Sequence, residues 1–230
     1  MNAHRVGTCE WWAALAACLL TLVACDRDQT SEQFGPPAPA SALRGLPLDQ
    51  PIQVTLETDH GSIACELDAG RVPRAVALFV GLATGRARWK HPKTGKLHSD
   101  PLYRDLTFHR AIPGVMIQSG CVVGDSSGHP GYRIPVEAHP DDAARLRQPG
   151  ALALARYTPP PFRKDPNPPP AGHVLGSQFA VTLTDMSHLA GEVTVLGRCQ
   201  NLDRVAAIAR AFKRNEERPR LHRVSVGGEK

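Results

Sequence analysis

Three side chains that could act together on a substrate lie within residues 107–120, TFHRAIPGVMIQSG. Alternation in an extended segment puts Phe108 and Arg110 on one side, and a Pro-Gly pair then bends the chain. A second extended piece carries Met116 and Gln118 on a shared face. The two pieces therefore present a cation, a thioether and an amide to one place. The alternative interpretation is a half-buried hairpin whose polar residues simply face water.

The elements that would hold this stretch follow from the periodicity of the rest of the chain. Residues 52–67 form two alternating, β-rich runs around a turn signal and predict a hairpin. Residues 73–84 change to a helical period, with proline in the first turn and glycine after the last. A second helix is predicted at 202–212, and residues 220–226 are typical of a closing strand. Strands around two helices favour a β-barrel plugged by helices at its ends.

The first 24 residues are typical of an export signal rather than of folded structure. A short polar start precedes an apolar run at residues 11–24, which is too short to span a bilayer. The run ends in LVAC, which looks like a bacterial lipobox with Cys25 as the lipidated residue. We expect acyl chains on Cys25 to anchor the protein to a membrane, because two or more chains suffice for stable attachment. The alternative is an ordinary signal peptide that happens to end in a cysteine.

Behind the signal, the sequence predicts a tether followed by one domain. Residues 25–50 are rich in Pro, Ala, Ser and charge with few bulky apolar side chains, which is typical of a flexible linker. Residues 51–230 are long enough for a single core. A proline-rich insertion at 156–176 is typical of a stiff surface loop, with a ligand for another module as the alternative. We expect a monomer in the bacterial cell envelope, lipid-anchored on the periplasmic side.

The charge of the chain indicates which partners to expect. The formal net charge is +5, and basic residues gather at 210–230. A basic tail can indicate nucleic acid or anionic lipid. Only 5% of the residues are aromatic, and export takes the protein away from nucleic acid. We therefore expect no nucleic-acid partner and keep contact with lipid head groups as a minor role.

Neither the cysteines nor the histidines predict a metal site. Beyond Cys25, the mature chain keeps Cys65, Cys121 and Cys199, an odd number without CxxC spacing. At most one disulfide can form within the domain, and we expect three buried thiols. The histidines are spread through loops and strands without paired ligand spacing, so we expect no metal.

Three separated motifs, FHRAIPGVMIQSG, GSQFAVTL and HLAGEVTVLGR, occur in an order and spacing that resemble those of the cyclophilin-type peptidyl-prolyl isomerases. Residues 129–141 and 149–155 fill the expected places between them, and the resemblance covers residues 50–226. It implies a mostly β fold, a closed eight-stranded antiparallel barrel capped by two α-helices. It also implies proline-containing polypeptides as substrates and a reaction without a cofactor.

The resemblance implies catalytic roles for Arg110 and Gln118. Rotation about an X-Pro bond loses amide resonance, with a barrier of about 18–20 kcal/mol, and a site that binds the twisted state better than either planar isomer accelerates it. In cyclophilins the arginine at the position of Arg110 donates to the prolyl nitrogen or holds the adjoining carbonyl. Gln118 would orient this guanidinium and contact the substrate backbone, and Met116 would line the proline pocket.

The other positions matched by the resemblance imply contacts with the substrate. These are His109, Val115, Met116, Ala155, Arg156, Gln178, Ala180, His188 and Leu189. Val115 and Ala180 stand where the family has phenylalanines flanking the proline ring, and Val193 stands where a histidine is usual. Arg156 replaces an asparagine, and His188 replaces a tryptophan. Val115, Ala180 and Val193 imply a wider and less apolar pocket, whereas the backbone of Arg156 could still pair with a peptide and His188 could partly replace the aromatic wall.

The sequence leaves two functions open. The first is an active, lipid-anchored isomerase that helps exported proteins pass slow proline steps, which Arg110 and Gln118 favour. The second is a cyclophilin-like module that binds proline-containing segments at the membrane surface with little or no turnover, which Val115, Ala180 and Val193 favour. We give the isomerase more weight because the arginine is the group that acts on the transition state.

Overall fold

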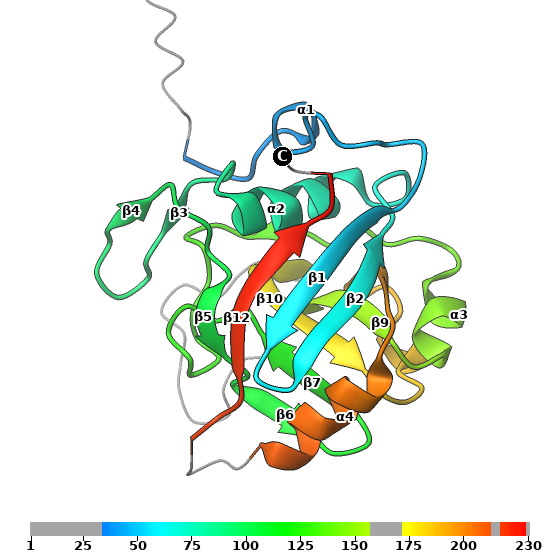
Figure 1. Cartoon of the computed structure of the whole chain (residues 1–230). Helices are drawn as coiled ribbons and strands as arrows, with labels where there is room; N and C mark the ends of the chain where they lie inside the picture. Colours follow the sequence, from blue (N-terminus) through cyan, green and yellow to red (C-terminus); the bar gives the residue numbers. More distant parts are fainter. Residues whose placement is uncertain (1–33, 157–171, 213–216, 229–230) are drawn as a thin grey trace, which may run out of the picture. The chain divides into compact units, whose positions relative to one another are not determined.

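The computed structural model describes residues 34–156, 172–212 and 217–228 (Figure 1). The predicted signal peptide, Cys25 and most of the proline-rich insertion lie outside these residues. Within the described part, no helix has both the length and the apolar character needed to cross a membrane.

One curled antiparallel sheet dominates the structure (Figure 1). In hydrogen-bonded order its strands are β5 (Arg104–Thr107), β12 (Arg220–Val226), β1 (Ile52–Thr58), β2 (Gly61–Leu67), β11 (Thr194–Cys199), β9 (Ala151–Arg156), β10 (His173–Thr182), β7 (Met116–Ser119) and β6 (Arg110–Ile112), with β8 (Ile134–Pro135) also on β10. A small second sheet pairs β3 (Trp89–Lys90) with β4 (Leu97–His98). The predicted hairpin at 52–67 and the closing strand at 220–226 are confirmed.

The expected closed eight-stranded barrel is wrong in two respects. The sheet has ten strands, and its path is open, with β5 at one edge and β6 at the other. These two edge strands are consecutive in the chain and are joined by Phe108 and His109. The N–H of Phe108 donates to Pro219 O at 2.9 Å, whereas that of His109 donates to Gln118 O at 3.1 Å. The two connecting residues thus bond to opposite edges of the sheet. Because β5 and β6 do not pair with each other, the architecture is an open half-barrel.

The two predicted helices are present as α2 (Pro73–Thr84) and α4 (Leu202–Ala211). Helix α2 ends where expected, because Gly85 takes a left-handed φ of 79° and a Cβ there would lie 2.8 Å from Ser99 O. The structure adds the short helices α1 (Pro39–Ala42), α3 (Asp142–Arg147) and the 3₁₀ turn η1 (Ser187–Leu189). These contain too few residues to show a helical period, so the sequence did not predict them.

Aromatic side chains fill the space between α2 and the sheet. Phe79 of α2 lies 5.0 Å from Tyr103 and 5.6 Å from Phe179 of β10, measured between ring centroids. All three side chains are essentially inaccessible to solvent. The Tyr103 hydroxyl donates to Ser177 O at 3.0 Å, so its one polar group is satisfied inside the core.

Residues 34–50 pack against the domain, although the sequence predicted a flexible tether through residue 50. Phe34 meets Tyr132 edge to face at 5.5 Å, and Leu43 and Leu46 are buried. The guanidinium of Arg86 donates to the backbone carbonyls of residues 42 and 44. A few well-placed apolar side chains therefore suffice to dock a segment whose average composition is that of a linker.

A disulfide joins Cys65 of β2 to Cys199 of β11, so the expectation of three buried thiols is wrong. The two residues lie directly opposite each other in the ladder, with their Cα atoms 3.9 Å apart. Strand register decides this pairing, and the spacing of cysteines in a sequence does not reveal register. Cys121 is a buried free thiol.

Candidate active site

The hairpin formed by β6 and β7 brings the three side chains of the opening motif together. Arg110 lies opposite Gln118, and Ile112 lies opposite Met116. The bend occurs at the Pro-Gly pair, where Gly114 takes a φ of 73°. The prediction that Phe108 shares the side of Arg110 is wrong, because strand pairing is interrupted at residues 108 and 109, before β6 begins. Its ring is instead fully buried in the core.

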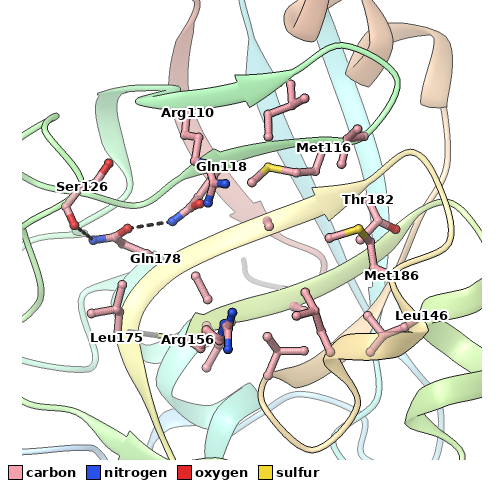
Figure 2. A pocket seen from close by; sticks show the side chains of 18 of the residues that line it. Arg110, Met116, Gln118, Ser126, Leu146, Arg156, Leu175, Gln178, Thr182 and Met186 are labelled. Atoms are coloured by element: carbon pink, nitrogen blue, oxygen red, sulfur yellow. Dashed lines mark hydrogen bonds between the residues drawn. The ribbon is translucent and has the colours of Figure 1, made fainter. Parts of the chain in front are cut away.

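A cavity of about 480 Å³ opens beside this hairpin, bounded by β6, β7, β9, β10 and residues 186–193 (Figure 2). Most of the predicted site residues line it: Arg110, Val115, Met116, Gln118, Ala155, Arg156, Gln178, Ala180, His188 and Leu189. This volume lies within the range of small-ligand sites in proteins. Residues far apart in the sequence therefore form one site.

Two buried glutamines form the polar side of the cavity (Figure 2). Gln118 Nε2 donates to Gln178 Oε1 at 2.9 Å. Gln178 Nε2 in turn donates to Ser126 O at 2.9 Å and to Gly128 O at 2.8 Å. The predicted substrate contact at Gln178 thus has its amide hydrogens engaged by the 126–128 loop. Its clearest role in the structure is to hold Gln118 in place.

A close approach between β7 and β10 fixes the positions of these glutamines. Gly120 follows β7 with a φ of 86°, and a Cβ at this position would lie 2.1 Å from Ser177 O. The Ser177 hydroxyl donates to Gly120 O at 2.8 Å. Only glycine fits here, because any side chain would push the two strands apart.

His109 does not line the cavity, in contrast to its predicted substrate contact. Its side chain is only 6% exposed and lies where the chain crosses between the two edge strands. Burial lowers the pKa of His109 from the usual 6.5 to about 4, so the imidazole is neutral at pH 7. This histidine belongs to the structure beneath the site and not to its surface.

More residues line the cavity than the predicted substrate contacts. They are Val193, which the resemblance had already placed in the pocket, and Ile112, Ser126, Leu146, Ala153, Leu154, Leu175, Thr182 and Met186. Alternation along β10 from Gln178 and Ala180 could have identified Thr182. Leu146 comes from the short helix α3, and the sequence contained no signal for its approach to the site.

The arrangement suits recognition of an apolar group next to a hydrogen-bond acceptor. Small or apolar side chains line most of the cavity, and the exposed guanidinium of Arg110 stands at its edge. Within residues 34–156, 172–212 and 217–228 there is no group of three or more His, Cys, Asp or Glu side chains able to hold a metal ion. The chemistry that these residues can supply is binding and charge-assisted hydrogen bonding.

Comparison with known proteins identifies the family. The model of the cyclophilin-type peptidyl-prolyl cis-trans isomerase/CLD family matches residues 53–226. The chain belongs to this family. The prediction of a cyclophilin-type peptidyl-prolyl isomerase, which is an enzyme, is thereby confirmed.

Individual family members show how far the similarity reaches. Peptidyl-prolyl cis-trans isomerase B of Streptomyces anulatus is 36% identical over 146 residues, covering 64% of this chain and 75% of that protein. Probable peptidyl-prolyl cis-trans isomerase A of Mycobacterium leprae is 34% identical over 175 residues, covering 75% and 88% of the two chains.

Solved structures support the fold. A Cryptosporidium parvum cyclophilin-type isomerase superposes with a TM-score of 0.59 at 20% identity, covering 76% of this chain and 97% of that one. A second structure of that protein, in the presence of the dipeptide Ala-Pro, superposes with a TM-score of 0.57 over 76% and 98% of the two chains.

Proposed function

We propose that this cyclophilin accelerates rotation of X-Pro bonds in exported polypeptides and that it acts as a monomer. The observation that carries the proposal is the placement of Arg110 opposite Gln118, at the edge of an apolar cavity that Met116 also lines. The Ala-Pro dipeptide present with the Cryptosporidium parvum relative supports a proline-containing ligand.

The proposed mechanism requires no covalent intermediate. The proline ring enters the apolar cavity next to Met116, which holds the rotating bond near Arg110. As the bond twists, amide resonance is lost and the prolyl nitrogen becomes a better hydrogen-bond acceptor. A guanidinium that donates to this nitrogen, or that holds the neighbouring carbonyl, binds the twisted state more strongly than the planar one and lowers the barrier.

A peptide exchange assay on the soluble domain, residues 34–230, tests this proposal. The domain should accelerate isomerisation of an Ala-Pro peptide, and Arg110→Ala should lower kcat/KM by about 10²-fold, since a lost electrostatic donor costs on the order of 3 kcal/mol. Arg104→Ala is the matched control, because Arg104 is exposed on β5 and does not line the cavity. Unchanged catalysis by a folded Arg110→Ala variant would refute the mechanism.

The second candidate is a module that binds proline-containing segments with little turnover. The small side chains of Val115, Ala180 and Val193 in the cavity favour it, because they leave less surface against a proline ring. Binding of a proline peptide without any acceleration of exchange would select this candidate over the isomerase.

We further propose that the domain is lipid-anchored through Cys25 on the periplasmic side of a bacterial membrane. The support is the LVAC ending of the apolar run at residues 11–24. Cys25→Ser should abolish incorporation of labelled lipid and leave the precursor unprocessed. Mass spectrometry of the native protein would contradict the anchor if the mature chain began elsewhere and carried no acyl group.

A further inference from the structure

The charges around the cavity are unbalanced. Among the residues that the structure describes, its lining includes two arginines, Arg110 on β6 and Arg156 at the end of β9, and no aspartate or glutamate. Figure 2 shows these two side chains on opposite sides of the cavity. A peptide lying across the site therefore passes between two cationic groups, of which only Arg110 is needed for the proposed chemistry.

Arg156 is paired with a carboxylate that precedes the neighbouring strand β11 and does not itself line the cavity. Its Nη1 forms an ion pair with Oε2 of Glu192, which lies between η1 and β11. Both side chains are 47% exposed, so the pair is solvated and contributes little to stability. A guanidinium has five N–H donors, and this contact engages one of its nitrogens. Arg156 can therefore accept a second carboxylate or exchange Glu192 for another one.

Two other acids adjoin lining residues in the sequence and have their own partners. Asp125 adjoins the lining residue Ser126, but it accepts from the backbone and hydroxyl of Ser127 and lies 3.6 Å from Lys93 Nζ. Asp185 accepts the Ser187 N–H at 2.8 Å. Neither acid forms an ion pair with Arg156, and Glu192 is the counter-charge that the described part of the chain provides.

We propose that Arg156 makes the enzyme prefer X-Pro segments that carry an acidic side chain within two residues of the proline, and that Glu192 competes for the same guanidinium. This inference rests on the proposed isomerase function. The N–H donors of Arg156 that Glu192 does not engage can hold a substrate carboxylate, so an acidic peptide gains an ion pair that a neutral peptide lacks. A basic residue at the same place meets two arginines of like charge.

The test compares peptides that differ in one residue. Each peptide contains one X-Pro bond and carries Glu, Gln or Lys at one of the four positions within two residues of the proline, with alanine at the others. The kcat/KM value is measured for each peptide. At one position or more, the Glu peptide should exceed the Gln peptide by about three-fold, the size of one exposed charge pair, and the Lys peptide should fall below both. This order should fade in 0.5 M salt, where the screening length is only about 4 Å.

Two variants assign the preference to the pair. Arg156→Asn should bring the Glu to Gln ratio to about one, and Glu192→Gln should raise it above the wild-type value by removing the competitor. Arg223→Asn and Glu57→Gln are the matched controls. These two side chains also form an ion pair, with Arg223 Nε 2.7 Å from Glu57 Oε1, and neither residue lines the cavity. Both controls should leave the ratio unchanged.

The outcomes separate this inference from the proposed function. Acceleration of the neutral Ala-Pro peptide with equal rates for Glu and Gln peptides at every position would overturn the charge preference and leave the isomerase intact. A preference that persists in Arg156→Asn would also overturn the assignment. A protein that accelerates none of the peptides would refute the isomerase itself.

Discussion

The two faces of β10 are built on opposite principles. On the inner face, Phe179 and Val181 are fully buried, and the Phe179 ring packs against Phe79 and Tyr103. On the outer face, Gln178 and Ala180 line the cavity. Neighbouring residues of one strand thus differ because one face maximises contact within the protein and the other leaves space for a ligand. Large apolar side chains identify the first face in a sequence, whereas the second face combines the polar side chain of Gln178 with the small one of Ala180.

The largest expected effect comes from emptying the inner face. Phe179→Ala should lower the free energy of unfolding by about 3–5 kcal/mol, because it removes a buried ring and leaves a cavity that its neighbours fill only in part. Denaturant unfolding of the purified domain measures this loss. Ala180→Gly on the outer face is the control and should cost about 1 kcal/mol or less. Equal losses for the two variants would contradict the contrast between the faces.

The disulfide stabilises the same sheet by covalent connection. Replacing Cys65 and Cys199 together by alanine should cost about 2–4 kcal/mol, because the bond links residues 134 positions apart and restricts the unfolded chain. Denaturant unfolding of the oxidised protein, the reduced protein and the double variant measures the effect. Reduction should destabilise the wild-type domain by a similar amount and leave the double variant unchanged. A wild-type domain whose stability does not respond to reduction would refute a stabilising bond.

His109 is buried in the connection between β5 and β6 and should make stability depend on pH. Its pKa of about 4 in the folded protein is below the usual 6.5, so the unfolded chain binds more protons between these values. The stabilisation is fully present above pH 6.5 and is lost as the pH falls through about 4, with a total of about 3 kcal/mol. His109→Gln should reduce the decrease in unfolding free energy between pH 7 and pH 4.

Carboxylates with lowered pKa values, such as Glu57 and Asp185, lose their stabilising charge mainly at still lower pH. They are also common to the wild type and the His109→Gln variant, so the difference between the two proteins isolates the histidine. Parallel pH profiles for the two proteins would show that His109 is not titrating as expected.

The sequence predicted those parts of the molecule that depend on local patterns. The period changes at 73–84 and 202–212 and the alternation at 52–67 gave the right elements, because each depends on residues near in sequence. The motifs also identified Arg110 and most of the cavity lining. The disulfide, the docking of residues 34–50 and the burial of His109 were missed. All three depend on register and on contacts between distant segments, which no local pattern contains.

The smallest expected effect concerns the cavity, which Ala180 on the outer face of β10 and Val115 just before β7 leave wide. Both residues are half-buried and line it, so larger rings at these positions would enter the cavity and not the packed core. A phenylalanine can bury some 150 Å² or more, of which only part would touch a proline ring. At about 25 cal/mol per Å², two such rings should strengthen substrate capture by on the order of 1–3 kcal/mol.

Val115→Phe combined with Ala180→Phe should therefore raise kcat/KM several-fold, chiefly through a lower KM, because Arg110 would act on the rotating bond as before. Adding Arg110→Ala to the double variant should remove the gain. Leu97→Phe, which adds a ring at an exposed position of β4, is the control and should change nothing. If the double variant folds and binds peptide no better than the wild type, the width of the cavity does not limit catalysis, and the contrast between the two faces of β10 is one of packing alone.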